Sequence, residues 1–256
     1  MTTDYKGISI AFTDTKNGRD TLVLLHGFLE NKNMWQPFIE PLSEKYRIIS
    51  IDLLGHGQTG CLGYVHTMEQ MADFVYAVLN HLKVDHVKLV GHSMGGYVAL
   101  AYAEKYTKQV TGICLMNSTA LPDTKEKQLN RDRAIKAIKQ NPKTFIRLSI
   151  NNLFMPANRE RLKNEIELVM AEALKIPMQG IIAALEGMKI RENRTHIFEN
   201  PNVDNLLIIG KNDPVIPIES LKEQRQHAKT VIFDGGHMSH IENKTEFLQT
   251  LLAFAN

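Results

Sequence analysis

The chain has 256 residues, of which 43% are hydrophobic and 23% are charged, and its formal net charge is +2. This length can bury a sizeable core as one large domain or two small ones. Because 30 basic residues nearly balance 28 acidic ones, the composition argues against a protein that binds nucleic acid or a membrane surface by bulk charge.

Short apolar runs that end in Gly, Asp, Asn or Ser recur along the chain and predict strands. The first run, residues 7–15, alternates between apolar and polar side chains, which indicates an antiparallel strand at the edge of a sheet. The later runs are apolar on both faces, which is typical of the interior of a parallel sheet. They cover residues 21–27, 47–52, 86–91, 110–118, 205–210 and 230–235.

Helical patterns fill the gaps between these strands. Residues 67–82 carry an apolar stripe at helical spacing, and Thr67 is a plausible N-cap. Residues 94–106 and 243–255 are also expected to form helices. The alternation of strand and helix predicts right-handed crossovers and an α/β fold with a mostly parallel sheet flanked by helices.

One stretch, residues 121–200, breaks this alternation. It contains no convincing strand and reads as several helices separated by prolines and polar residues. Such a stretch is far longer than an ordinary crossover. We therefore predict a core domain formed by residues 1–120 and 201–256, with a helical cap at 121–200 inserted between late strands.

Ser93 lies where the strand at 86–91 passes into the helix at 94–106, within the sequence GHSMG. A sharp strand-to-helix turn imposes strained backbone angles on its central residue, and only small residues fit two positions before and after it. The turn lifts the hydroxyl clear of the sheet, and the start of the helix favours negative charge. Ser93 is therefore a candidate nucleophile, although an ordinary turn serine is the alternative.

A serine hydroxyl needs a base, and the base needs an orienting acid. Asp213 follows the strand at 205–210, and His237 follows the strand at 230–235. The carboxyl ends of the strands in an open α/β sheet form the edge where its sites lie, so both residues belong beside Ser93. Asp213 could instead only open the Asp-Pro turn. Rival residues are Asp204 and Asp234 as the acid and His240 as the base.

Five motifs, LLHGF, DLLGHGQT, GHSMGG, GKNDPVIP and GGHMSHIE, follow one another through nearly the whole chain. In these motifs the chain resembles the α/β-hydrolase superfamily, and in particular serine hydrolases of the carboxylesterase kind with a helical cap. The resemblance implies Ser93 as nucleophile, Asp213 as acid and His237 as base. It also implies an oxyanion hole formed by the backbone N–H groups of Phe28 and Met94. Acyl transfer in this family needs no cofactor, and without an HExxH motif no metal is expected.

The expected activity is hydrolysis of a small carboxylic ester through an acyl-enzyme, and Trp35 and Phe154 are weak candidates for contacting the substrate. The same triad would also serve a carbon–carbon bond hydrolase, a perhydrolase or acyltransferase, or a lyase. A ligand-sensing protein with slow turnover is an alternative of another class. The only partner expected is a small molecule, and the sequence leaves the natural substrate and the oligomeric state open.

The compartment is predicted from what the sequence lacks. No segment approaches the roughly 18 consecutive apolar residues of a membrane span, and no signal-peptide pattern is visible. The two cysteines are in neither a CxxC pair nor a metal-binding spacing. We therefore expect a soluble protein of the reducing cytoplasm.

Overall fold

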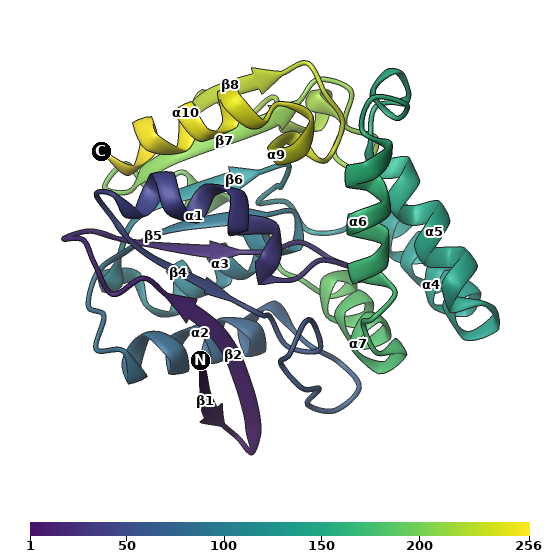
Figure 1. Cartoon of the computed structure of the whole chain (residues 1–256), viewed down its shortest axis with the longest axis horizontal. Helices are drawn as coiled ribbons and strands as arrows, with labels where there is room; N and C mark the ends of the chain where they lie inside the picture. The colour runs from purple at the N-terminus through teal and green to yellow at the C-terminus, as the bar shows by residue number, and fades with distance from the viewer.

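An eight-stranded sheet forms the centre of the computed structural model, which describes residues 1–256 (Figure 1). The strand order is β1-β2-β4-β3-β5-β6-β7-β8. From β4 to β8 every neighbouring pair is parallel, whereas β2 is antiparallel to both of its neighbours. The strands are β1 (Thr2–Tyr5), β2 (Ile8–Asp14), β3 (Thr21–Leu25), β4 (Arg47–Ile51), β5 (Val87–His92), β6 (Val110–Met116), β7 (Asp204–Gly210) and β8 (Lys229–Phe233).

The mostly parallel sheet confirms the predicted fold class, but one edge of the sheet differs from the prediction. Residues 7–15 do form an antiparallel strand, β2, yet β1 pairs along its outer side with Thr2 opposite Ala11. The prediction that this strand is the edge of the sheet is therefore wrong. The sequence of β1, TTDY, has no apolar alternation to signal a strand, because an edge strand buries little of its surface.

Helices cover both faces of the sheet (Figure 1). Successive residues of a strand point to opposite faces, so β3 sends Leu22 and Leu24 into one core and Val23 and Leu25 into the other. Helices α1 and α10 complete the first core, and α2 and α3, together with residues of the 121–200 stretch, complete the second. These helices are α1 (Gln36–Ser43), α2 (Met68–His81), α3 (Met94–Lys105) and α10 (Lys244–Ala255); a short helix, α9 (Ser239–Glu242), precedes α10.

Local sequence explains which of these helices could be predicted. Thr67 caps α2 as expected: its hydroxyl accepts the Gln70 N–H at 3.1 Å, and the Gln70 side chain accepts the Thr67 N–H. The prediction missed α1, which has only eight residues and contains Pro37 and Pro41. Proline inside a helix removes a backbone hydrogen bond, so α1 depends on packing beneath the sheet rather than on its own propensity.

Residues 121–200 contain helices and no strand, and they connect β6 to β7. They lie beyond one end of the strands (Figure 1). A side-chain carbon on Gly180 would collide with the carbonyl of Gly55, so this insertion packs tightly against the loop after β4. The helices of the insertion are α4 (Lys125–Gln140), α5 (Pro142–Leu153), α6 (Lys163–Ala173), α7 (Met178–Lys189) and α8 (Thr195–Phe198).

The length and hydropathy of the helices show whether any of them could span a membrane. No single helix is long and apolar enough to cross a bilayer. Taken together, α6 and α7 pass the same test of length and composition, but their axes meet at 97°. Most of α7 is buried, including Ala183 and Ala184, so its apolar residues belong to the protein core.

Candidate active site

Ser93 occupies a strained turn between β5 and α3. Its φ is +49° and its ψ is −112°, a left-handed region that residues with a side chain seldom adopt. Backbone strain of this kind costs about 1–3 kcal/mol and persists only where surrounding structure enforces it. Here the Ser93 N–H donates to Met116 O at 2.9 Å, and the Ser118 hydroxyl donates to Ser93 O at 2.7 Å. Strand β6 therefore holds the turn in place.

Glycines make room for this turn, as the spacing predicts. A side-chain carbon on Gly91 would collide with the backbone of Gly95 and Gly96, and one on Gly95 would collide with the carbonyl of Leu25. The end of β3 and the start of α3 are therefore in direct contact. This contact places the loop after β3 beside the nucleophile candidate.

His237 and Asp213 form a buried pair. His237 Nδ1 lies 2.7 Å from Asp213 Oδ2, which also accepts the Asn117 side-chain amide at 3.0 Å. The other oxygen, Oδ1, accepts the N–H groups of Val215 at 2.8 Å and Ile216 at 3.0 Å. Burial by itself would raise the pKa of Asp213, but the His237 ring and these hydrogen bonds lower it below its ordinary value. Asp213 is thus an ionised carboxylate that fixes one nitrogen of the His237 ring.

Ser93, the third residue of the predicted triad, is slightly more exposed than His237. Ser93 is 9% exposed and His237 is 3% exposed. Ser93 Oγ and His237 Nε2 make no hydrogen bond to each other or to other protein groups, and neither is among the solvent-inaccessible polar atoms that lack a partner. Catalytic hydrogen bonds are often long in a free enzyme and shorten when substrate binds. Both reactive atoms are therefore free and accessible.

The backbone around His237 is held from two sides. The His237 N–H donates to Leu153 O, at the end of α5, over 2.8 Å. The Gly236 N–H donates to Glu242 Oε1 at 2.8 Å, and Gly236 O accepts the Asn117 amide at 3.1 Å. The helical insertion, α9 and β6 thus fix the loop that carries the imidazole.

The two predicted oxyanion donors lie in the loop after β3 and at the start of α3. Phe28 lies in this loop, and its N–H donates to no protein group. Met94 is the first residue of α3, so its N–H has no acceptor within the helix. The preceding N–H, of Gly27, donates to Glu30 Oε2 at 2.7 Å. The loop is therefore anchored at Gly27 and leaves the next N–H free.

Glu30 belongs to a buried cluster with two histidines beside this loop. Glu30 Oε2 lies 2.6 Å from His92 Nδ1, and Glu30 Oε1 lies 3.8 Å from His240 Nε2. Burial opposes ionisation of Glu30, but the charge and hydrogen bond of His92 lower its pKa to about 2. Burial likewise opposes protonation of His92, but Glu30 raises its pKa above the ordinary value. Both shifts favour the charged forms of this pair, a carboxylate and an imidazolium.

The same three residues have the donor atoms of a metal site, since all of these atoms lie within 4.8 Å of one another. Two ligands of a tetrahedral zinc, each about 2.0–2.1 Å from the metal, lie about 3.3 Å apart. The 2.6 Å between Glu30 and His92 is shorter than that and is a hydrogen-bond distance. The geometry therefore favours a shared proton over a metal.

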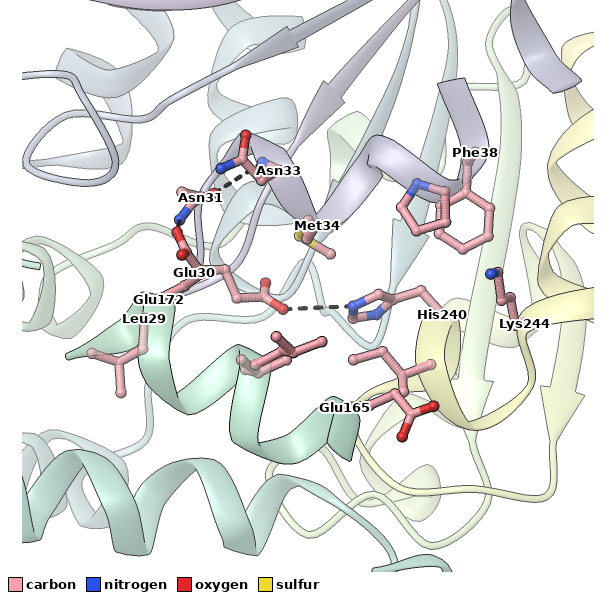
Figure 2. A pocket seen from close by; sticks show the side chains of 14 residues that line it. Leu29, Glu30, Asn31, Asn33, Met34, Phe38, Glu165, Glu172, His240 and Lys244 are labelled. Carbon is pink, nitrogen blue, oxygen red and sulfur yellow. Dashed lines mark hydrogen bonds and ion pairs between the residues drawn. The ribbon is translucent and has the colours of Figure 1, made fainter. Parts of the chain in front are cut away.

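A cavity of about 280 Å³ lies on the outer side of this cluster (Figure 2). The side chains of Glu30 and His240 point toward each other along one wall, and α6 forms the opposite wall. Ser93 is not among the residues that line it. The apolar part of the wall consists of Leu29, Met34, Phe38, Leu168, Val169 and Ile241.

The two weak candidates for substrate contact are both buried. Trp35 is fully enclosed in the core beneath the sheet, where its ring stacks on Phe247 with the centroids 6.3 Å apart. Trp35 therefore has a packing role. Phe154, at the end of α5, lines a surface cavity of about 520 Å³ together with Pro214 and Val215, next to Asp213.

Sequence reasoning missed several residues that build this site. Asn117 and Ser118 directly follow β6 at the same edge as Ser93, where polar residues after an apolar run were the available signal. Glu242 lies within GGHMSHIE, and Glu30 lies three positions after Gly27. Each of these residues stands close to a motif, but nothing in the sequence reveals its partner.

Buried histidines lead to a prediction about stability and pH. Burial lowers the pKa of His56 and His240 to about 3 and that of His66 to about 4, and it also lowers the pKa of His26. Unfolding restores values near 6.5, so below pH 6.5 the unfolded chain binds protons that the folded chain does not. Between pH 6.5 and pH 4.5 the free energy of unfolding should therefore fall by about 2–3 kcal/mol for each histidine whose pKa in the folded protein lies below 4.5.

This prediction can be checked by urea unfolding between pH 7 and 4.5. His92, with its raised pKa, acts in the opposite direction but is one residue against four. His56→Asn removes one of the four and should flatten the dependence of unfolding free energy on pH. A protein that becomes more stable toward pH 4.5 would contradict the prediction.

Comparison with known proteins bears on the fold and the site together. A family model described as "alpha/beta hydrolase fold" matches residues 20–244. This match includes Ser93, Asp213 and His237. Among solved structures, a thermophilic esterase from Thermogutta terrifontis has a TM-score of 0.91 and 31% identity, covering 99% of this chain and 95% of that one.

Two curated relatives are similar to this chain over nearly its whole length. The 3-oxoadipate enol-lactonase 1 of Acinetobacter baylyi is 24% identical, covering 97% of this chain and 93% of its own length. The dihydrolipoyllysine-residue acetyltransferase component of an acetoin cleaving system from Cupriavidus necator is 26% identical over 95% of this chain. The chain spans 66% of the length of that second relative.

Proposed function

Because this chain belongs to the α/β-hydrolase family, we propose that it is a serine hydrolase that cleaves small carboxylic esters. Ser93 is the proposed nucleophile, His237 the base and Asp213 the acid that orients it. The observation that carries this proposal is the buried 2.7 Å pair of His237 Nδ1 and Asp213 Oδ2 at the sheet edge that also holds the strained Ser93.

The proposed reaction begins when Ser93 Oγ attacks the ester carbonyl carbon while His237 Nε2 takes the hydroxyl proton. The carbonyl electrons move to oxygen, and the N–H groups of Phe28 and Met94 stabilise the resulting oxyanion. When the carbonyl re-forms, the alcohol leaves with the proton from His237 and an acyl-Ser93 ester remains. His237 then takes a proton from water, whose oxygen attacks the acyl carbon. When this second tetrahedral species collapses, the bond to Ser93 Oγ breaks, His237 returns its proton to Oγ, and the carboxylic acid is released.

Asp213 supports this cycle through charge and geometry. Its carboxylate accepts a hydrogen bond from Nδ1–H of His237, which leaves Nε2 as the proton acceptor that faces the substrate. The same charge stabilises the imidazolium that forms when the Ser93 proton is transferred. Its lowered pKa keeps it ionised over the working range of an esterase.

Similar proteins support an ester as the substrate. The solved structure at 31% identity is named an esterase, and an enol-lactone, as in the name of the Acinetobacter relative, is a cyclic ester. Both reactions attack an acyl carbon bound to oxygen. An acyl-enzyme hydrolysed by water accounts for both substrates with one set of residues.

Residues 121–200 are proposed to act as a cap over this site. The insertion contacts the site loops twice: Gly180 packs on Gly55, and Leu153 O accepts the His237 N–H. Helices in such a position can shape the pocket and gate access to it. A cytoplasmic location is part of the same proposal and agrees with Cys61 and Cys114, which are both free thiols.

Labelling with a fluorophosphonate probe tests the proposal. We expect one adduct, located on Ser93 by mass spectrometry, and hydrolysis across a series of nitrophenyl esters with short to long acyl chains. Absence of label from Ser93 in the folded protein would disprove its role as nucleophile. Labelling without turnover of any ester would favour a ligand sensor or a lyase.

A further inference from the structure

We propose that Glu30, paired with His92, is a positioning residue that holds the oxyanion loop, the Ser93 turn and the His237 loop in one arrangement. The inference rests on the proposed function, since it concerns how the parts of that site are aligned. Three loops that are far apart in the sequence meet at this pair. A chain of hydrogen bonds and close contacts connects them through Glu30 and His92.

The first contact is with the oxyanion loop. Glu30 Oε2 accepts the Gly27 N–H at 2.7 Å, one residue before the proposed donor N–H of Phe28. Leu29, the residue after Phe28, has a φ of +63°, which a leucine seldom adopts. A loop in this conformation needs an anchor, and the carboxylate of Glu30, three residues after Gly27, supplies it.

Packing at Gly27 places the ion pair against the backbone of the same loop. A side-chain carbon on Gly27 would lie 2.5 Å from Glu30 Oε2 and 2.7 Å from His92 Nδ1. No side chain fits in that space, so the backbone of Gly27 rests directly on the pair. Movement of either side chain would therefore allow the loop to shift.

His92 connects Glu30 to the other two loops. It is the residue before Ser93, and its Nε2 lies 3.0 Å from the backbone oxygen of His237. Since Nδ1 faces a carboxylate and Nε2 faces a carbonyl, both ring nitrogens donate. One imidazolium thus links the Ser93 turn to the loop that carries the proposed base.

The energetics of this pair indicate that it fixes the geometry of the site and adds little to the stability of the fold. Glu30 is 5% exposed and His92 is 1% exposed, so two charges lose nearly all of their hydration. A buried ion pair seldom adds net stability compared with apolar residues of similar volume. In addition, Glu30 Oε1 and His240 Nδ1 are buried without hydrogen-bond partners. What the pair provides is a fixed direction for each of its hydrogen bonds.

Two substitutions separate positioning from stability. Glu30→Ala removes the anchor, and we expect kcat to fall about 100-fold with KM little changed, since small displacements of catalytic groups cost about that much. Affinity for a boronic acid, which forms a tetrahedral adduct with the nucleophile, should fall in parallel. In Glu30→Gln the amide oxygen can take the place of Oε2, where it still accepts from the Gly27 N–H and from Nδ1–H of a neutral His92. This variant should retain kcat within about tenfold of the wild type.

The double variant Glu30→Met with His92→Leu fills the space with apolar side chains. It should unfold at a temperature close to that of the wild type or higher, yet keep the 100-fold loss of kcat. The double variant also tests the positioning role if Glu30→Ala does not fold. Asp14→Asn is the matched control, because Asp14 is a carboxylate buried against Arg47 at the opposite edge of the sheet. It should lose stability and keep kcat.

The outcomes distinguish this inference from the proposed function. A folded double variant with wild-type kcat and boronic acid affinity would overturn the positioning role. So would a loss of activity in Glu30→Ala that merely follows the unfolded fraction at the assay temperature. If wild-type protein neither labels at Ser93 nor hydrolyses esters, the proposed function fails instead, before any Glu30 variant is considered.

Discussion

Replacing Ser93 with alanine is expected to lower kcat for nitrophenyl ester hydrolysis by about 10⁶-fold, to near the background rate. The reason is that no other group in the site can form the acyl-enzyme. Stability should change little, because the Ser93 hydroxyl makes no hydrogen bond to protein and alanine meets the same backbone strain at φ +49°. Stopped-flow kinetics and mass spectrometry of the trapped acyl-enzyme would measure the loss.

Ser43→Ala is the matched control for this experiment. Ser43 ends α1, and its hydroxyl bonds only to Glu40 O at an exposed position. This variant should hydrolyse esters at the wild-type rate. If Ser93→Ala retained more than a few per cent of wild-type activity, another residue or an activated water would be the nucleophile.

The second large effect is expected for Asp213→Asn. An amide at this position can donate to His237 Nδ1, which stabilises the tautomer with its proton on Nε2. That tautomer cannot accept the Ser93 proton, so kcat should fall about 10⁴-fold while KM changes little. The rate of fluorophosphonate labelling should fall in parallel, since it depends on the same proton transfer.

The rival acids provide the controls for Asp213. Asp234 lies at the end of β8 with an exposed side chain, and Asp204 pairs with Lys88 at the start of β7. Neither contacts His237, so Asp234→Asn and Asp204→Asn should keep wild-type kcat. A larger loss in either control than in Asp213→Asn would show that the acid has been assigned to the wrong residue.

Much of the fold could be predicted because its signals are local. A buried parallel strand must be apolar on both faces, and that pattern identified all six strands from β3 to β8. Thr67, a residue type that favours the N-cap, identified the start of α2. By contrast, β1 and α1 have weak local signals: β1 is a polar edge strand, and α1 contains two prolines. These elements form because the neighbouring strands or the core stabilise them.

The residues of the site likewise divide into those with a signal in the sequence and those whose position depends on the tertiary structure. Ser93 could be found because the strained turn requires glycines at fixed positions nearby in the sequence. Asp213 and His237 could be placed at one sheet edge because parallel strands share the direction of their carboxyl ends. Trp35, by contrast, was a candidate for substrate contact on sequence and is enclosed in the core. Its position depends on α1, which the sequence did not predict.

The sequence by itself determined the positions of strands β2 to β8 along the chain, the insertion of helices before β7 and the turn that carries Ser93. These features depend on residue size, backbone angles and periodic burial, which act over a few neighbouring positions. Only the tertiary structure decided that Glu30 faces His92 and that Asn117 binds Asp213, 96 positions away. Periodicity shows which face of an element is buried, but the partner of a polar side chain depends on how distant loops converge.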